Sequence, residues 1–423
     1  MAFFLIILGL TSSLPHNPRA LALSNAYTSI AFGFDAPLYN PANLGSPKNP
    51  KFSSRILNGW VIPLTPVGIL GIYPTYNSSF SLSEIDSYFY SGRYLDDATK
   101  QKILNSIPNK GFSMGLDAGI GILELSFKNF AFSLRAFSGT KNRIPKDVFD
   151  LILFGNKLGE EYNYLENLRI ETLSYGTLTL SYGRMVSFGE TPISLGVGFR
   201  SMGGLFYGVV DEAKGSLDTR DTTHFDAFGD IKFKGGLGGY GFGLDFGILS
   251  ELSNGWSFSL AVLNANRGMN WKIEAMEGAL SFRAESLSVI NVITKELDTL
   301  VTSTSEIDTL KSIRSALPSF LRIGVAGRLN PNILLVADIV NGLSNTPLSS
   351  TTPELCVGLE YSGIDFLTMR AGLALGGQEG FIISYGFGSS IWGLHLDVGV
   401  QNIRGIFLWS KGGRMSLDVG YFP

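Results

Sequence analysis

The sequence predicts an all-β protein, a transmembrane antiparallel β-barrel of about 14 strands, with 16 as the other possible count. Charged residues make up only 16% of the 423 residues, while the chain holds 30 Phe and 16 Tyr; ordinary globular domains carry about 25% charged residues. Beyond the N-terminus no apolar run reaches the length of a transmembrane helix. Apolar side chains instead alternate with glycine and small polar residues, which is how a membrane barrel distributes its hydrophobicity.

Composition also excludes several classes of function. A net charge of -3 excludes a strongly basic nucleic-acid binder. One cysteine and three histidines leave too little for a disulfide framework or a metal site, so we expect no metal and no cofactor. His395 and Asp397 lie two apart on one strand face, but no nucleophile or oxyanion donor accompanies them. We therefore expect no catalytic residues and no enzyme.

The chain opens with an apolar segment, Phe3 to Leu10, followed by small residues. Such a segment predicts a secretory signal over residues 1–13; the alternative is a buried strand at the mature N-terminus. The barrel itself is expected over residues 51–423.

Alternation with a period of two recurs along most of this region. Ile193, Leu195 and Val197 face one way, while Gly196 and Gly198 face the other. The polar face is too small and too weakly charged for a water-exposed exterior, so it suits a lumen in which glycines leave room for an inner segment. A soluble all-β fold is the alternative.

Short and long connections alternate along the chain, as they do between the periplasmic turns and outer loops of such barrels. Short turns are predicted at Lys128-Asn129 and Asn330-Pro331. Counting residues 55–73 as one bent strand gives 14 strands. The long outer loops are expected over residues 74–110, 138–169, 202–236 and 265–317.

Two of these loops carry helical patterns, Asp96 to Ile107 and Pro145 to Phe154. The second has proline at its start and glycine at its end, which is typical of a helix. Its apolar residues Val148, Leu151, Ile152 and Phe154 are unsuited to a freely solvated loop, so we expect them to be buried against something. The loops would either cover the barrel mouth or form a docking surface or a substrate-entry site.

Both signs of charge occur on the face assigned to the lumen. The candidates are Asp117, Arg135, Arg200, Asp245, Arg322, Arg328, Asp338, Glu360, Arg370, His395 and Asp397. An unpaired charge in a narrow lumen is costly, so these groups either pair with one another or select a ligand, with arginines contacting a carboxylate head group.

The segment from Ala20 to Ala31, followed by Asp35-Ala36-Pro37 and Asn40-Pro41-Ala42-Asn43, resembles the start of the long-chain fatty-acid transporter superfamily of bacterial outer membranes (FadL-like proteins). It is similar above all to the branch related to the type IX secretion barrel PorV. Residues 317–342 and 369–388 resemble uncharacterised barrels of the same superfamily. The chain departs from the pattern in having one Asp, Asp35, where two are frequent.

The resemblance implies a barrel in the outer membrane of a Gram-negative bacterium, surrounded by lipid. It also implies that residues 14–50 fold into the lumen as a hatch, with Asp35, Asn40, Pro41 and Ala42 where hatch meets wall; Asn-Pro alone would form a rigid turn. The expected function is passive transport of hydrophobic or amphipathic small molecules. The alternatives are a sealed barrel that docks secreted or surface proteins, and a purely structural protein.

Overall fold

A computed structural model describes residues 17–56, 60–63, 80–85, 87–88, 94–188, 191–219, 224–288, 301–391 and 394–421. The predicted signal segment, the start of the loop 74–110 and the side chain of His395 lie outside the described residues. The helical elements are α1 (Pro18–Ala22), η2 (Gly33–Asp35), α2 (Ala36–Tyr39), η3 (Pro41–Gly45), α3 (Leu82–Ile85), α4 (Asp97–Ser106), α5 (Lys146–Phe154) and η6 (Phe407–Trp409).

Nineteen strand segments form one antiparallel sheet. They are β1 (Phe52–Ile56), β2 (Trp60–Pro63), β3 (Phe112–Phe127), β4 (Phe130–Ile144), β5 (Glu161–Tyr162), β6 (Arg169–Phe188), β7 (Thr191–Thr219), β8 (His224–Glu251), β9 (Trp256–Asn266), β10 (Met269–Ser288), β11 (Thr302–Thr309), β12 (Ile313–Ser315), β13 (Phe320–Asn330), β14 (Ile333–Gly342), β15 (Glu354–Ile364), β16 (Leu367–Gly376), β17 (Gly380–Ile391), β18 (Leu394–Ile403) and β19 (Gly412–Tyr421).

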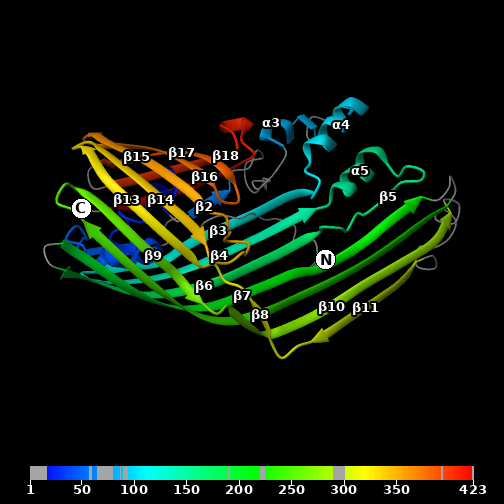
Figure 1. The fold of residues 1–423 in the computed structure, drawn as a ribbon, viewed down its shortest axis with the longest axis horizontal. Helices are drawn as coiled ribbons and strands as arrows, with labels where there is room; N and C mark the ends of the chain where they lie inside the picture. The colour runs from blue at the N-terminus through cyan, green and yellow to red at the C-terminus, as the bar shows by residue number, and fades with distance from the viewer. Residues whose placement is uncertain are drawn as a thin grey trace.

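The pairings run around a barrel (Figure 1). Each long strand pairs with its neighbours in the chain. The sheet closes through β1 and β2, because β1 pairs with β3 and β2 pairs with β19. Three groups of segments each count as one wall strand: β1 with β2, β9 with β10, which both pair with β8, and β11 with β12 and β13, which pair with β10 and β9; β5 is only a short addition to β7. The wall thus has 14 strands, which confirms the predicted fold class and count.

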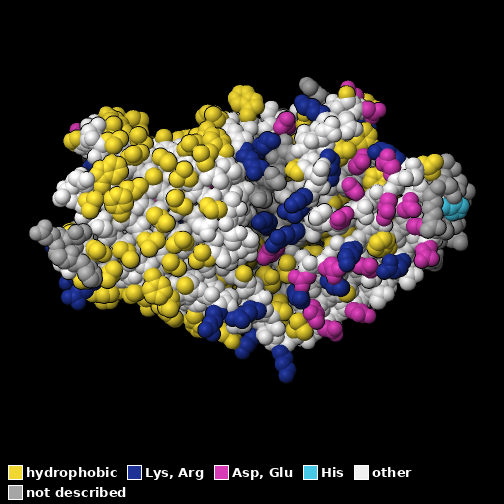
Figure 2. Space-filling model, viewed as in Figure 1, with side chains coloured by type: hydrophobic (Ala, Val, Ile, Leu, Met, Phe, Trp, Pro, Cys, Tyr) yellow, Lys and Arg dark blue, Asp and Glu magenta, His cyan; other side chains and the backbone are white. Residues whose placement is uncertain are grey.

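Apolar side chains cover the outside of the barrel wall. Figure 2 shows them spread over the part of the molecule that holds the short strands. Exposed members of this belt include Phe127, Phe130, Leu180, Val197, Phe199, Phe242, Phe246, Phe258, Leu260, Ile323, Ile339, Leu359, Leu373 and Phe387. A barrel that presents such a belt outward and small polar residues inward is a membrane barrel, and barrels of this kind lie in outer membranes.

Four strands continue far beyond the belt, which corrects the loop boundaries expected from the sequence. Residues 202–236 and 265–317 were expected to be loops, but β7 and β8 continue as paired strands to Thr219 and from His224, and β10 and β11 fill much of the second stretch. Beyond the belt, these four strands carry charged residues on their outer face, which is apolar within the belt. The alternation of apolar and polar residues that marks the wall strands is therefore lost there (Figure 2). Water solvates both faces of the sheet there, so the strands stay paired without alternating apolar and polar side chains.

The two predicted loop helices are present as α4 and α5, and they pack together at the outer end of the barrel (Figure 1). The expected burial is wrong for Ile152, which is 73% exposed, while Val148, Leu151 and Phe154 are only half-buried. Phe149 and Leu153, four apart on one helix face, instead pack on a cluster of Phe80, Ile103, Ile107 and Phe112. Among the described residues, no helix is long and apolar enough to cross a membrane.

Residues 17–50, termed the hatch below, lie inside the barrel and are almost entirely buried (blue in Figure 1). Wall glycines make room for the hatch backbone, because a side chain at these positions would overlap it. Gly183, Gly196 and Gly247 lie against the segment Asn40–Gly45, Gly358 and Gly372 against Leu23 and Ser24, and Gly386 and Gly399 against α1.

A bulky residue at one of these glycines should therefore weaken the folded barrel. Gly196→Leu would place a side chain onto the backbone of Pro41 and Ala42, and overpacking of this kind costs about 1–3 kcal/mol. We expect samples of this variant to change from the folded to the unfolded band on a gel after heating to a lower temperature than the wild type needs. Gly203→Leu is the matched control on the same strand, since Gly203 faces open space; equal shifts for both variants would contradict the packing argument.

Candidate functional site

The hatch contains four short helical turns, and asparagine caps the start of two of them, α1 and η3. Asn17 accepts a hydrogen bond from the Ala20 amide (2.6 Å), and Asn40 accepts one from the Ala42 amide (3.0 Å). Each cap is followed by proline, which fits the first position of a helical turn. The other end of the Asn40 amide donates to the carbonyl of Ile248 on β8 (3.0 Å), so this turn is also joined to the wall.

Asp35 forms hydrogen bonds within the hatch. Its carboxylate accepts hydrogen bonds from Asn17 Nδ2 (2.8 Å) and from the hydroxyl of Tyr27 (3.4 Å). It thus ties the beginning of the hatch to its middle. Asn43 adds two further internal bonds, to the carbonyls of Thr28 and Ala31.

The strongest link between hatch and wall is centred on Asp338 of β14. One of its oxygens accepts from the backbone amides of Tyr27 (3.0 Å) and Thr28 (2.9 Å) and from the Thr28 hydroxyl. Arg322 on β13 pairs with the same oxygen (3.2 Å), and it donates to the Thr28 hydroxyl and to the carbonyl of Asn25. Hydrogen bonds from charged donors are stronger than neutral ones, so Asp338 and Arg322 together hold the hatch segment Asn25–Thr28 against the wall.

A second link is centred on Glu360 of β15. Both of its oxygens accept from Arg19 of the hatch (2.7 and 2.8 Å), and one of them also accepts from Arg370 on β16 (2.8 Å). Arg370 in turn pairs with Asp397 on β18. These four residues form an alternating chain of charges that joins α1 to β15, β16 and β18.

Most other residues assigned to the lumen from sequence also lie in ion pairs. Arg200 pairs with Asp245 (2.7 Å), Arg135 with Glu124 (2.5 Å), and Asp117 with Arg414 (3.7 Å), which also binds Glu379. Arg328 does not belong to this set, because it is exposed at the end of β13, where it donates to the carbonyl of Pro331. Arg328 lies near the end of β13, next to the turn that leads to β14, and not in the lumen.

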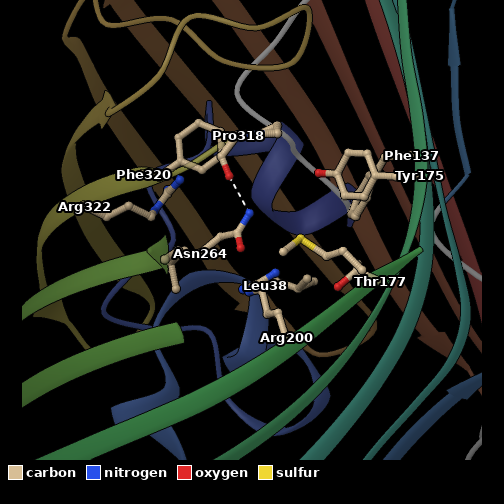
Figure 3. Close-up of a pocket in the computed structure, with 11 residues that line it drawn as sticks. Leu38, Phe137, Tyr175, Thr177, Arg200, Asn264, Pro318, Phe320 and Arg322 are labelled. Carbon is tan, nitrogen blue, oxygen red and sulfur yellow. Dashed lines mark hydrogen bonds between the residues drawn. The ribbon is translucent and has the colours of Figure 1, made fainter. Parts of the chain in front are cut away.

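A small pocket lies directly against the hatch (Figure 3). Its apolar lining is Leu38 of the hatch with Phe137, Met202, Leu263, Pro318 and Phe320, and its polar lining is Tyr175, Thr177, Arg200, Asn264 and Arg322. The cavity measures about 30 Å³, which is room for about two water molecules. A larger solute would fit into this pocket only after movement of the hatch or the wall.

The pocket holds polar atoms that lack partners. Asn264 Oδ1 and Thr177 Oγ1 are buried without any hydrogen bond, although Asn264 Nδ2 donates to the Pro318 carbonyl (Figure 3). In the part of the chain that the structure describes, neither Arg200 nor Arg322 uses Nη1 in a hydrogen bond. Unpaired buried polar groups are rare unless water or a ligand satisfies them.

Both pocket arginines also hold the hatch. Arg200 Nη2 donates to the Pro37 carbonyl (2.7 Å), and Arg322 Nη2 donates to the Asn25 carbonyl (2.6 Å). An anion that bound these guanidinium groups would compete with the hatch backbone for the same donors.

On the outer side, the pocket merges with an apolar cluster that fills the lumen. Met202, Phe137 and Tyr175 belong to both, and the cluster continues through Leu173, Met269, Trp271, Ala275, Ile313, Leu317 and Leu348. Trp271 is fully buried, stacks on Tyr207 and donates to Ser315 Oγ (2.9 Å). The cluster is buried and packed, so a molecule coming from outside would reach the arginines of the pocket only after these apolar side chains moved apart.

Several residues of this site were missed by reasoning from the sequence. Glu124 was missed because a bulge between Gly121 and Leu123 shifts the register of β3, which turns Glu124 to the inside. The alternation of β19, with Arg414 and Ser416 opposite Met415 and Leu417, would have revealed Arg414. No sequence pattern marks Arg19, whose partner Glu360 is 341 residues away.

Comparison with known proteins gives one family match. The model of a family of unknown function, DUF5723, matches residues 65–361. No curated protein sequence matches the chain significantly.

Solved barrels of similar outline are found among outer-membrane transporters. A FadL homologue from Pseudomonas aeruginosa is 13% identical, with 97% of this chain and 96% of that chain covered and a TM-score of 0.45. The Ralstonia pickettii toluene transporter TbuX is 11% identical, with 96% and 98% covered and a TM-score of 0.49. A variant of the monoaromatic hydrocarbon channel TodX is 11% identical, with 95% and 98% covered and the same TM-score.

Proposed function

The chain belongs to the family of unknown function DUF5723, and we propose that it lets hydrophobic and amphipathic small molecules cross the outer membrane passively. The observation that supports this most is the lumen pocket, in which apolar side chains from the wall meet two arginines that hold the hatch. Apolar pockets with a few convergent polar groups are typical of small-molecule sites.

The order of the lining residues favours an amphipathic solute with an anionic head. The outer side of the pocket is packed with Met269, Trp271 and Leu317, which would have to move apart to receive an apolar tail, and the pocket below offers Arg200 and Arg322 to a carboxylate. Arginine binds carboxylates with two parallel hydrogen bonds when its geometry allows. A head group that accepted the hydrogen bonds which Arg200 and Arg322 donate to the Pro37 and Asn25 carbonyls would loosen the hatch. The solute itself would then open its own path.

Blocking the pocket tests this proposal. Leu263→Trp enlarges a lining side chain that is only 4% exposed, so we expect uptake of a long-chain fatty acid into proteoliposomes to fall about tenfold, the equivalent of about 1.4 kcal/mol. Leu260→Trp is the matched control, since Leu260 is on the same strand, is 40% exposed and faces lipid. Equal uptake by both variants would refute the pocket as the route.

The same assay distinguishes transport from the docking function that a PorV-like relation would imply. A docking barrel would stay sealed, so the intact protein would show no uptake above that of empty liposomes. Removal of residues 17–50 would then admit small solutes without any preference for apolar ones. Uptake by the intact protein that Leu263→Trp abolishes favours transport.

A further inference from the structure

The outer sheet formed by the extensions of β7, β8, β10 and β11 ends in an open edge. β11 pairs with β10 from Thr309 opposite Met276 to Thr302 opposite Arg283. All eight of its residues are exposed, and no described segment of the chain pairs with its other side. Alternate residues of such an edge present unpaired N–H and C=O groups, which can accept a further strand.

Charges run in rows across this sheet, and the rows end at β11. Lys234, Glu277 and Asp308 are directly paired neighbours on three successive strands. In the next row, Lys232 and Glu306 flank Ala279. Directly opposed residues of antiparallel strands point to the same face, so the outermost positions of both rows carry a carboxylate.

The lysines of these rows are already engaged on their inner side. Lys234 pairs with Asp211 (2.6 Å), and Lys232 pairs with Glu212 (2.8 Å), which also binds Lys214 (2.5 Å). Hydrogen bonds from Lys214 and Lys232 lower the pKa of Glu212 to about 2.

At the edge of the sheet formed by β11, negative charges are not matched by positive ones. Within the described residues, Glu277, Glu306 and Asp308 have no salt-bridge partner, so the edge keeps an excess of negative charge. A shallow hollow of the same sheet face is lined by these three carboxylates on its β11 side and by Asp211, Glu212, Lys232 and Lys234 on its inner side.

We propose that β11 binds an extended strand of another protein that carries lysine or arginine at alternate positions. The added strand would pair its backbone with the open edge, and its basic side chains would lie opposite Glu306 and Asp308. In strand addition, main-chain hydrogen bonds supply affinity and alternate side chains supply specificity. Each opposite-charge pair across such strands contributes about 0.2–1 kcal/mol.

Two other occupants fit the edge less well. A second copy of β11 has no basic residue and would bring Glu306 and Asp308 against like charges, which is destabilising. The described part of the chain also contains no group of three His, Cys, Asp or Glu placed to hold a metal ion. The inference is independent of transport, because it concerns only the outer sheet and its test measures binding alone.

The test uses the full-length protein in detergent and a fluorescent peptide of about the length of β11, in which lysine alternates with threonine. We expect saturable binding that the double variant Glu306→Lys/Asp308→Lys weakens about tenfold or more, a change of about 1.4 kcal/mol. Glu285→Lys is the matched control, since Glu285 is exposed on β10 beyond the stretch paired with β11. Unchanged heat-modifiability on gels would show that each variant is folded.

A second peptide separates strand addition from simple charge attraction. The same sequence with all backbone amides methylated keeps its charge but loses its N–H donors, and we expect it to bind at least about tenfold more weakly. Equal binding of both peptides would overturn the proposal, as would an equal effect of Glu285→Lys and the double variant. Self-association of the protein that the double variant abolishes would identify a second copy as the occupant and would also overturn it.

Discussion

Replacing Asp338 by alanine is expected to release the hatch and to convert a closed barrel into one that conducts ions. Asp338 accepts two backbone amides and one hydroxyl of the hatch, and it neutralises Arg322. Removal of one partner from a buried ion pair costs about 3–5 kcal/mol, because the other charge is left uncompensated. Since the pocket against the hatch holds only about 30 Å³, we expect the wild-type barrel to conduct little.

The measurement is single-channel conductance of the refolded protein in planar bilayers. Asp365→Ala provides the control, since Asp365 lies exposed in the short turn between β15 and β16. Frequent openings in the Asp338 variant alone would show that this carboxylate holds the hatch. If the variant stays as closed as the wild type and unfolds at the same temperature, the Arg19–Glu360 pair and the glycine contacts hold the hatch without Asp338.

The wall of the barrel could be predicted from sequence because a single physical rule generates it. A strand between lipid and lumen must alternate, and the run from Tyr240 to Ile248 does so without interruption, with Asp245 and Gly247 inside. The rule fails where the surroundings change. A bulge at Gly121/Leu123 reverses inside and outside for Glu124, and water on both faces removes the alternation beyond the membrane, where β11 was expected to be loop.

The site could be predicted only as a list of charges. Arg200, Arg322 and Asp338 stand out as polar residues on apolar strands, but their partners are set by strand pairing and by the fold of the hatch. The pocket brings together residues of β4, β6, β7, β9 and β13 with Leu38 of the hatch. Their sequence separations, such as the 294 residues between Thr28 and Arg322, leave no local trace, so the structure was needed to group them.

A negative charge placed in the pocket should select against anionic solutes while sparing neutral ones. Thr177 on β6 lines the pocket, and its buried hydroxyl has no hydrogen-bond partner. A carboxylate there would either neutralise Arg200 and Arg322 or repel an incoming head group, and such effects are strong in a site with little water. For Thr177→Asp we expect uptake of a fatty acid to fall about tenfold, the equivalent of about 1.4 kcal/mol, and uptake of the alcohol with the same chain to stay unchanged.

Thr177→Asn is the matched control, because it adds nearly the same volume without the charge. A loss of acid uptake in the Asp variant alone means that the arginines recognise the head group, since shape is the same in both variants. Equal losses of acid and alcohol uptake in both variants mean that the pocket tolerates no larger side chain and that the arginines do not select. If neither solute is affected, solutes pass the hatch without entering the pocket, and the contacts of Arg200 and Arg322 with the hatch are purely structural.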